Sequence, residues 1–233
     1  MMTTGDLQGH WRRDWIKAPE FEDGTTRVHW MQSGALFVDI RVPRDRPDLS
    51  GHTCLADLPT EALDALLQAE GFAGTIVVAQ DQCTWRREIN WHGVPQAEDI
   101  GIMSFDGDTL YEDGVLAEYR EKWHPEPTAP KRGARIKAGA MAGVLIDTDE
   151  LFLFGIGPEP TYHVDPSHGD RLAVAAHFAS TYCLGRWTGD EGIALLSTNP
   201  FCEGQIILTR AETWVWHTMS FDGVTDRQPL TLH

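Results

Sequence analysis

Residues Thr25–Val42 read TTRVHWMQSGALFVDIRV, and this stretch decides the fold. Its two runs of β-branched and aromatic residues flank Ser33-Gly34, a dipeptide typical of the tight turn of a β-hairpin. A shift of 116 positions brings a second such hairpin into register at Met141–Pro158, which reads MAGVLIDTDELFLFGIGP. The same shift superimposes Met103–Gly107 on Met219–Gly223, and both segments read MSFDG. We therefore expect an internal duplication that gives two related β units.

The composition indicates a soluble globular protein with an acidic surface. Hydrophobic residues make up 42% of the 233 residues and charged residues 23%, which suffices for a sizeable core. The net charge is -16, so the surface repels phosphate backbones and anionic lipids. We therefore expect neither a nucleic acid nor a membrane as partner. The nine tryptophans combine a large apolar area with one N–H donor and are expected to line cores or a pocket.

The cysteines and the first residues bear on the compartment. The four cysteines show no CxxC spacing and no tight pairing pattern, and the first residues, MMTTGDLQGHWRRDW, contain no apolar leader. No apolar run approaches membrane-spanning length. We therefore expect a cytoplasmic protein with reduced thiols. The cysteines are Cys54, Cys83, Cys183 and Cys202.

Residues 1–124 are expected to form the first unit. Short connections link about eight strand-like runs, enough to close a small up-and-down antiparallel barrel. Leu58–Glu70 is the one convincing helix, with Thr60 as its N-cap and Gly71 just after its end. We expect this helix to cover an open end of a sheet.

A proline-rich linker at residues 125–133 leads to the second unit at residues 134–233. Under the 116-residue shift, the counterpart of Val115–His124 would lie beyond His233. The second unit is therefore expected to lack the final strand and to form an incomplete barrel. We expect its free edge to be covered by a domain contact or paired in a homodimer. Within this unit, Arg171–Thr188 fits either a short helix or a strand.

A Gly-x-Trp near the start of the first strand, Gly9-His10-Trp11, followed by an antiparallel meander, resembles the calycin superfamily of lipocalins and fatty-acid-binding proteins. The whole pattern also resembles a bacterial family of uncharacterised two-domain lipocalin-like proteins. The resemblance implies a mostly β chain of two tandem related antiparallel lipocalin-like barrels, the second incomplete, with one short helix in the first. It also implies that Trp11 closes the barrel floor, with Arg120 or Lys122 packed over it, and that the protein carries a small ligand.

Strand alternation indicates which side chains share a face. In the first hairpin, for example, Phe37, Asp39 and Arg41 oppose Leu36, Val38, Ile40 and Val42. Charged residues thus interleave with aromatic ones, as in a barrel lumen that binds a carboxylate or phosphate through arginine. The alternative is that these charges lie on the solvated face as weak cross-strand pairs, because alternation alone does not say which face is inside. The expected ligand-binding residues are Trp11, His29, Trp30, Asp39, Arg41, Trp85, Arg86, Tyr119 and Trp123.

Two other functions compete with ligand binding. An enzyme acting through the same lumen would use His29 with Asp39, the best acid–base candidate, although the chain has no nucleophile elbow, HExxH motif or phosphate loop. An interaction or dimerisation module would use the free edge of the second unit. The loop with His163, Asp165 and His168 has metal-like spacing and haem ligation has precedent in calycins, but we predict no metal and the sequence names no cofactor.

Overall fold

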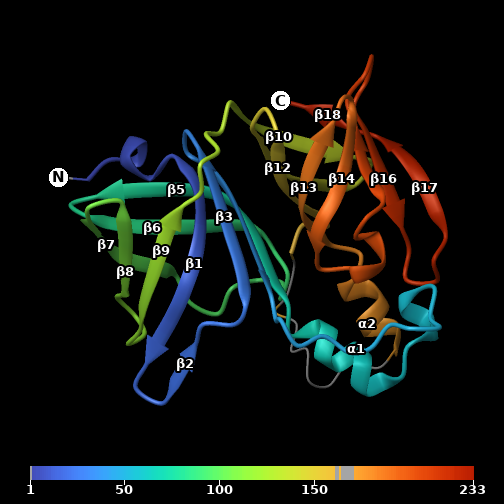
Figure 1. Cartoon of the computed structure of the whole chain (residues 1–233), viewed down its shortest axis with the longest axis horizontal. Helices are drawn as coiled ribbons and strands as arrows, with labels where there is room; N and C mark the ends of the chain where they lie inside the picture. Colours follow the sequence, from blue (N-terminus) through green and yellow to red (C-terminus); the bar gives the residue numbers. More distant parts are fainter. Residues whose placement is uncertain (1, 161–162, 164–170) are drawn as a thin grey trace.

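The computed structural model describes residues 2–160, 163 and 171–233, which form two antiparallel β-sheets side by side (Figure 1). In the first sheet each strand pairs with its neighbours in the order β2-β1-β3-β4-β5-β6-β7-β8-β9, and β1 also pairs with β9, which closes a barrel. The mostly β architecture with two barrel-like sheets is thus confirmed. The strands are β1 (Gly9–Ala18), β2 (Phe21–Asp23), β3 (Arg27–Ser33), β4 (Leu36–Val42), β5 (Glu70–Ala79), β6 (Gln82–Asn90), β7 (Asp99–Asp106), β8 (Thr109–Gly114) and β9 (Arg120–Pro125).

The hairpin that opened the sequence analysis forms β3 and β4. Ser33 pairs with Leu36, so the turn residues are Gly34 and Ala35, one residue later than expected. The backbone angle φ of Gly34 is 57°, a left-handed conformation that glycine adopts without the steric cost of a side chain. The second hairpin forms β11 and β12, as the duplication predicts.

The second sheet has the order β17-β16-β15-β14-β13-β12-β11-β10-β18 and is nearly closed. Its last two strands, β17 and β18, lie at opposite edges of the sheet. Since Leu230 alone separates them in the sequence, the chain itself spans the gap between these two edges. The strands are β10 (Arg132–Ala138), β11 (Met141–Asp147), β12 (Leu151–Gly157), β13 (Thr181–Thr188), β14 (Glu191–Ser197), β15 (Ile206–Thr209), β16 (Val215–Met219), β17 (Thr225–Pro229) and β18 (Thr231–Leu232).

The reason for the incomplete barrel differs from the expected one. The repeated MSFDG segments do not lie at equivalent places, because the first ends β7 and the second begins at the last residue of β16. β15 and β16 follow β14 as β7 and β8 follow β6, and β17 and β18 together take the place of β9, since β17 pairs with β16 and β18 with β10. The final strand of the second sheet is not missing: β18 pairs with β10 as β9 pairs with β1, but it is only two residues long.

The first helix is shorter than expected. α1 (Thr60–Leu67) begins after Pro59, whose carbonyl accepts hydrogen bonds from the backbone N–H groups of Ala62 and Leu63. Thr60 is thus the first helical residue and not the N-cap. At the other end Glu70 already pairs with Arg41 in the sheet, so the β-ladder takes over the chain.

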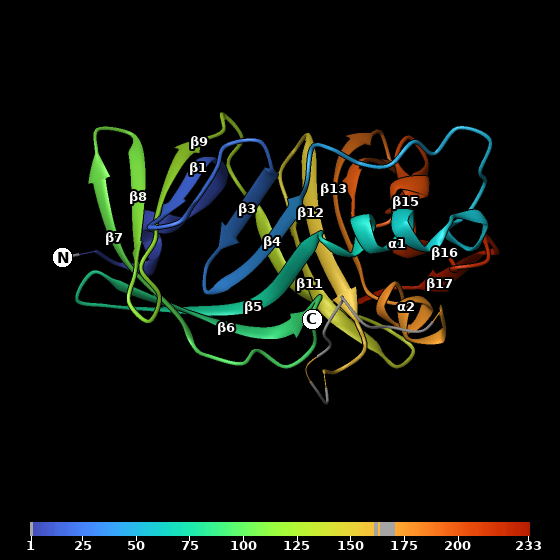
Figure 2. The same ribbon diagram turned by 90° about the horizontal axis from the view of Figure 1, so that it is seen from below.

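The ambiguous segment Arg171–Thr188 contains both elements, α2 (Arg171–His177) and then β13. Figure 2 shows α1 and α2 together on the side of the second sheet. No helix in the described parts of the chain has the length and apolar character needed to cross a membrane.

A large apolar core joins the two sheets. Val38, Ile40 and Val42 point from the outer face of β4 into it, while the alternate residues of this strand point into the first barrel. The leucines of α1 and residues of the second sheet, such as Val144 and Leu153, complete this core. The two sheets are therefore packed on each other through the outer face of β4.

Candidate ligand site

Tryptophans fill one end of the first barrel. Trp30 lies at its centre, with ring centroids 5.8 Å from Trp85, 5.8 Å from Trp123 and 6.2 Å from Trp11. These four side chains are at most 7% exposed. The expected tryptophans are thus inside the barrel and brought together, but they contact one another as a packed core.

The barrel floor differs from the calycin expectation in one contact. The Trp11 indole N–H donates to the Leu7 carbonyl at 2.9 Å, so this tryptophan is anchored at the end of the barrel. The two expected basic partners lie elsewhere, because Trp11 pairs with Pro125 while Arg120 and Lys122 occupy the opposite end of β9. Arg120 instead forms an ion pair with Asp113 on the exposed surface.

The other half of the first-barrel interior is charged, as alternation suggested for Asp39 and Arg41. The Arg41 Nε donates to Asp39 Oδ1 at 3.0 Å, and its Nη1 lies 3.5 Å from Glu121 Oε1. Arg13 shares the same carboxylate, with Nη1 2.6 Å from Glu121 Oε1, and also contacts Asp23. These buried arginines therefore already have carboxylate partners within the protein.

Burial changes the acidity of this network. It raises the pKa of Asp39 to about 6, although the neighbouring Arg41 acts in the opposite direction. Burial, and next the charge of Glu121, raise the pKa of Glu112 well above its ordinary value. Tyr119 donates its hydroxyl hydrogen to Glu112 Oε1 at 2.7 Å, so this expected residue also lies in the network.

Two expected residues point away from the lumen. His29 lies opposite Ile40 and Asp39 lies opposite Trp30, so the proposed acid–base pair is on opposite faces of the hairpin, and this interpretation is wrong. The His29 ring is instead 3.0 Å from the His10 ring, between Nδ1 and Nε2. Arg86 is exposed, and its neighbour Arg87 takes the inner position.

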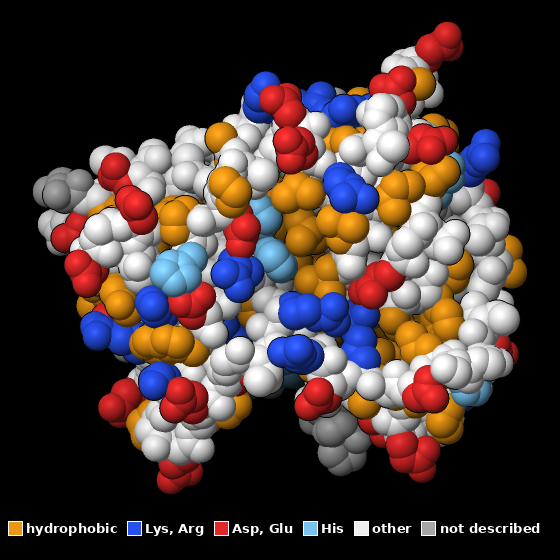
Figure 3. Space-filling view, in the orientation of Figure 1, with side chains coloured by type: hydrophobic (Ala, Val, Ile, Leu, Met, Phe, Trp, Pro, Cys, Tyr) orange, Lys and Arg blue, Asp and Glu red, His pale blue; other side chains and the backbone are white. Residues whose placement is uncertain are grey.

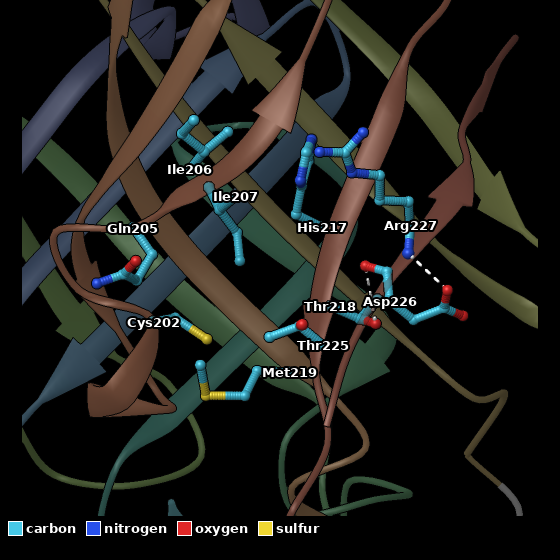
Figure 4. A pocket seen from close by; sticks show the side chains of 10 residues that line it. All are labelled: Cys202, Gln205, Ile206, Ile207, His217, Thr218, Met219, Thr225, Asp226 and Arg227. Atoms are coloured by element: carbon cyan, nitrogen blue, oxygen red, sulfur yellow. Dashed lines mark hydrogen bonds between the residues drawn. The ribbon is translucent and has the colours of Figure 1, made fainter. Parts of the chain in front are cut away.

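An open pocket lies in the second sheet, where the short strand β15 meets β16. The two strands pair only through Leu208 with Trp216 and Thr209 with Val215, and beyond this point they separate. The resulting pocket has a volume of about 490 Å³, within the range of small-molecule sites (Figure 4). Its lining residues are Cys202, Gln205, Ile206, Ile207, His217, Thr218, Met219, Thr225, Asp226 and Arg227.

This pocket has an apolar end and a polar end (Figure 4). Cys202 and Met219 lie near each other with Ile207 above them, and burial raises the pKa of the Cys202 thiol to about 12, so this thiol is neutral. His217 and Arg227 project together at the other end. Burial, and next the Arg227 charge, lower the pKa of His217, which also contacts Thr209 Oγ1 at 3.3 Å.

Sequence reasoning did not find these lining residues. The repeat gave no signal for them, because the 116-residue shift does not hold beyond the hairpin and β15 begins 107 residues after β7. The partial pairing of β15 with β16 has no sequence signal either. The pocket therefore depends on the incomplete pairing of β15 with β16, which strand alternation does not predict.

Metal chemistry finds no support in the described residues, where no group of three or more His, Cys, Asp or Glu is arranged to hold an ion. Of the loop with metal-like spacing, His163 is exposed and bridges to Gly93, whereas Asp165 and His168 lie outside the described residues. All four cysteines are buried and free.

Comparison with known proteins gives a likeness of fold. No family model and no curated protein matches the chain. A solved structure, that of the uncharacterised protein YLR301w from Saccharomyces cerevisiae, is similar over 96% of this chain and 98% of that chain. The TM-score is 0.54 and the sequence identity 11%, so the likeness shows a shared fold alone.

Proposed function

We propose that the protein is a lipocalin-like, cytoplasmic binder of a small amphipathic carboxylate, held in the pocket between β15 and β16. The observation that carries this proposal is the division of one pocket of about 490 Å³ into an apolar end and a basic end. A hydrocarbon chain would contact Ile207, Cys202 and Met219. The carboxylate would reach Arg227, whose guanidinium suits bidentate binding of carboxylates.

The charges around this pocket favour an acidic ligand. Arg227 forms no ion pair with any described residue, and the Asp226 carboxylate beside it accepts the backbone N–H of Arg227 at 2.7 Å. The guanidinium is exposed and available to a ligand. His217 adds a neutral imidazole that can donate one hydrogen bond.

The first barrel supports the same function less well. Its tryptophans are packed together and its buried arginines are paired with carboxylates, so the expected ligand contacts are made within the protein. The enzyme alternative loses its acid–base pair, and the interaction alternative loses part of its free surface, because β18 pairs with β10 and the outer face of β4 covers the second unit. We expect no nucleic-acid or membrane partner.

Isothermal titration of octanoate, with octanol as the uncharged control, tests the proposal. We expect the wild type to bind octanoate more tightly than octanol. R227Q should weaken octanoate binding about 10- to 100-fold, the effect of losing a charge-assisted hydrogen bond, and leave octanol binding unchanged. The control R186Q changes an exposed arginine of the same sheet and should bind like the wild type.

Filling the apolar end gives the second arm of the test. I207W introduces a large side chain into the pocket and should abolish binding of both ligands. If the wild type binds neither ligand, or if R227Q and I207W bind both like the wild type, the pocket is not a carboxylate site.

A further inference from the structure

A second open site lies on the outside of the first barrel, and most of the charged residues that line it are basic. Where β1 and β3 separate beyond the pairing of Arg12 with His29, they leave a cleft of about 490 Å³. Arginines 12, 13, 27 and 44 and His29 line it, together with one carboxylate, Asp14. Figure 3 shows Lys and Arg side chains gathered at the centre of this face, beside histidines, where the two sheets meet.

Internal partners neutralise only part of this charge. Arg12 forms an ion pair with Glu126 at 2.7 Å, and Arg13 forms ion pairs with Glu121 and Asp23 inside the barrel. The single carboxylate of the cleft, Asp14, is itself paired with His124 at 2.7 Å and with Lys122 at 3.4 Å. The cleft therefore retains positive charge that the protein does not balance.

Two arginines carry that charge. Arg27 and Arg44 make no side-chain hydrogen bond or ion pair with any described residue, and the Arg27 Nε is shielded from water without a partner. Arg46 lies close enough to Arg27 for the two charges to interact, and it forms an ion pair at 2.6 Å with Glu203, which lies between β14 and β15 of the second unit. An unpaired, partly buried guanidinium is costly unless a ligand uses it.

We propose that this cleft binds the phosphate group of a soluble small molecule through Arg27 and Arg44. Guanidinium groups present their N–H donors in a planar fork that matches phosphate oxygens, and two of them facing one cleft suit a doubly charged group. The volume of the cleft leaves room for more than the phosphate itself. On a chain of net charge -16, a local basic cleft also concentrates the field that attracts an anion.

Isothermal titration with pyrophosphate and with ribose 5-phosphate tests this inference. The wild type should bind both at low salt, and binding should weaken steeply as sodium chloride is raised. R27Q and R44Q should each weaken binding at least about tenfold, the loss expected for one charge-assisted contact. Because Arg44 is exposed, R44Q leaves the core intact and keeps the test valid should R27Q unfold.

Controls distinguish the source of the anion. R186Q, on the second sheet, should bind like the wild type, and R227Q should leave phosphate binding unchanged because that residue belongs to the other pocket. Absence of binding by the wild type, or equal binding by R44Q, would overturn the proposal. Binding only to phosphatidylcholine vesicles that contain phosphatidic acid, and to neither soluble phosphate, would also contradict it.

Discussion

Two glutamates inside the first barrel illustrate how neighbouring residues of one type acquire opposite roles. Glu121 accepts contacts from both Arg13 and Arg41, whereas Glu112, directly opposite on β8, accepts a hydrogen bond from the Tyr119 hydroxyl and, among the described residues, forms no ion pair. Burial and the charge of Glu121 raise the pKa of Glu112 well above its ordinary value, which favours the protonated form of this carboxyl. One glutamate thus balances two arginines, and the other makes a hydrogen bond to a neutral hydroxyl.

These roles predict unequal effects of the same substitution. E121Q should lower the free energy of unfolding by about 3–5 kcal/mol, because it leaves two buried arginines without their shared carboxylate. E112Q should change it by less than about 1 kcal/mol at pH 7, because a neutral amide of similar shape replaces a carboxyl whose neutral form is favoured by burial. Urea unfolding at pH 7 measures both, and equal losses would contradict the assignment of roles.

The pH dependence of E112Q follows from the same assignment. Since the pKa of Glu112 is higher in the folded protein than in the unfolded chain, the folded state binds more protons above pH 4.5, and this residue makes stability fall as pH rises. E112Q should remove that contribution, so its stability relative to the wild type should increase with pH. A constant difference between pH 5 and pH 8 would count against a protonated Glu112.

A histidine at the junction of the two sheets gives the opposite dependence. His177 is buried against Trp91, with ring centroids 4.4 Å apart, and burial lowers its pKa to about 3. Its contribution is fully present above pH 6.5 and is lost as pH falls toward 3. H177F should therefore reduce the loss of stability between pH 7 and pH 5 by about 2 kcal/mol. His10 and His29, whose pKa values are also lowered, contribute to the remaining loss.

Alternation grouped most first-barrel residues on the correct faces, without saying which face is inside, but failed at β6. Glu88 is an extra residue in that strand, where the register shifts between Ala73 and Gly74 of β5. The side chains after it change faces, so Asn90 joins Arg87 inside while Ile89 turns toward the other sheet. Such a bulge has no signature in strand periodicity.

At the scale of elements, two glycines allow the strands of the two sheets to approach. The ring of Tyr182, on β13, lies against both Gly71 of β5 and Gly155 of β12, and a side-chain carbon added at either glycine would overlap the ring. The tyrosine is completely buried. This arrangement fixes the spacing between the sheets with one aromatic ring.

G71A should therefore lower the free energy of unfolding by about 1–3 kcal/mol or more, because the methyl group forces the sheets apart. G5A is a suitable control, because only ordinary van der Waals contact with Thr3 is expected there. Urea denaturation of the two variants provides the comparison. Equal stability would mean that Tyr182 does not set the spacing.

The elements also show how far the duplication could be interpreted. The repeated hairpin corresponds to equivalent strands, so the shift located the start of the second unit well, whereas the MSFDG segments end β7 and β16, which are not equivalent strands. A fixed shift of 116 does not place β15, which begins 107 residues after its counterpart β7. The same fixed shift put the counterpart of the last strand beyond His233, whereas β17 and β18 together take the place of β9.

At the scale of the molecule, the largest apolar core belongs to both sheets. α1 contributes Leu63 and Leu66 to it, and the outer face of β4 and residues such as Val144 contribute the rest. The sequence predicted two units but gave no means to decide that an apolar outer face of one barrel would pack on the other. We therefore expect the two sheets to unfold together.

Differential scanning calorimetry tests this expectation. The wild type should show a single transition, and L66A should shift that entire transition, with a loss of about 2–5 kcal/mol for a buried leucine. L195A changes a leucine that is 43% exposed and should have little effect. Two separate transitions, with only one of them moved by L66A, would show that the sheets are independent.

The most direct test of the proposed function is nuclear magnetic resonance of the ¹⁵N-labelled protein during titration with octanoate. The account predicts progressive shifts of the backbone amide signals of 205–207, 217–219 and 225–227, which surround the pocket between β15 and β16, with the first barrel unaffected. Shifts confined to the tryptophan or charged ends of the first barrel, or none at saturating octanoate, would contradict it.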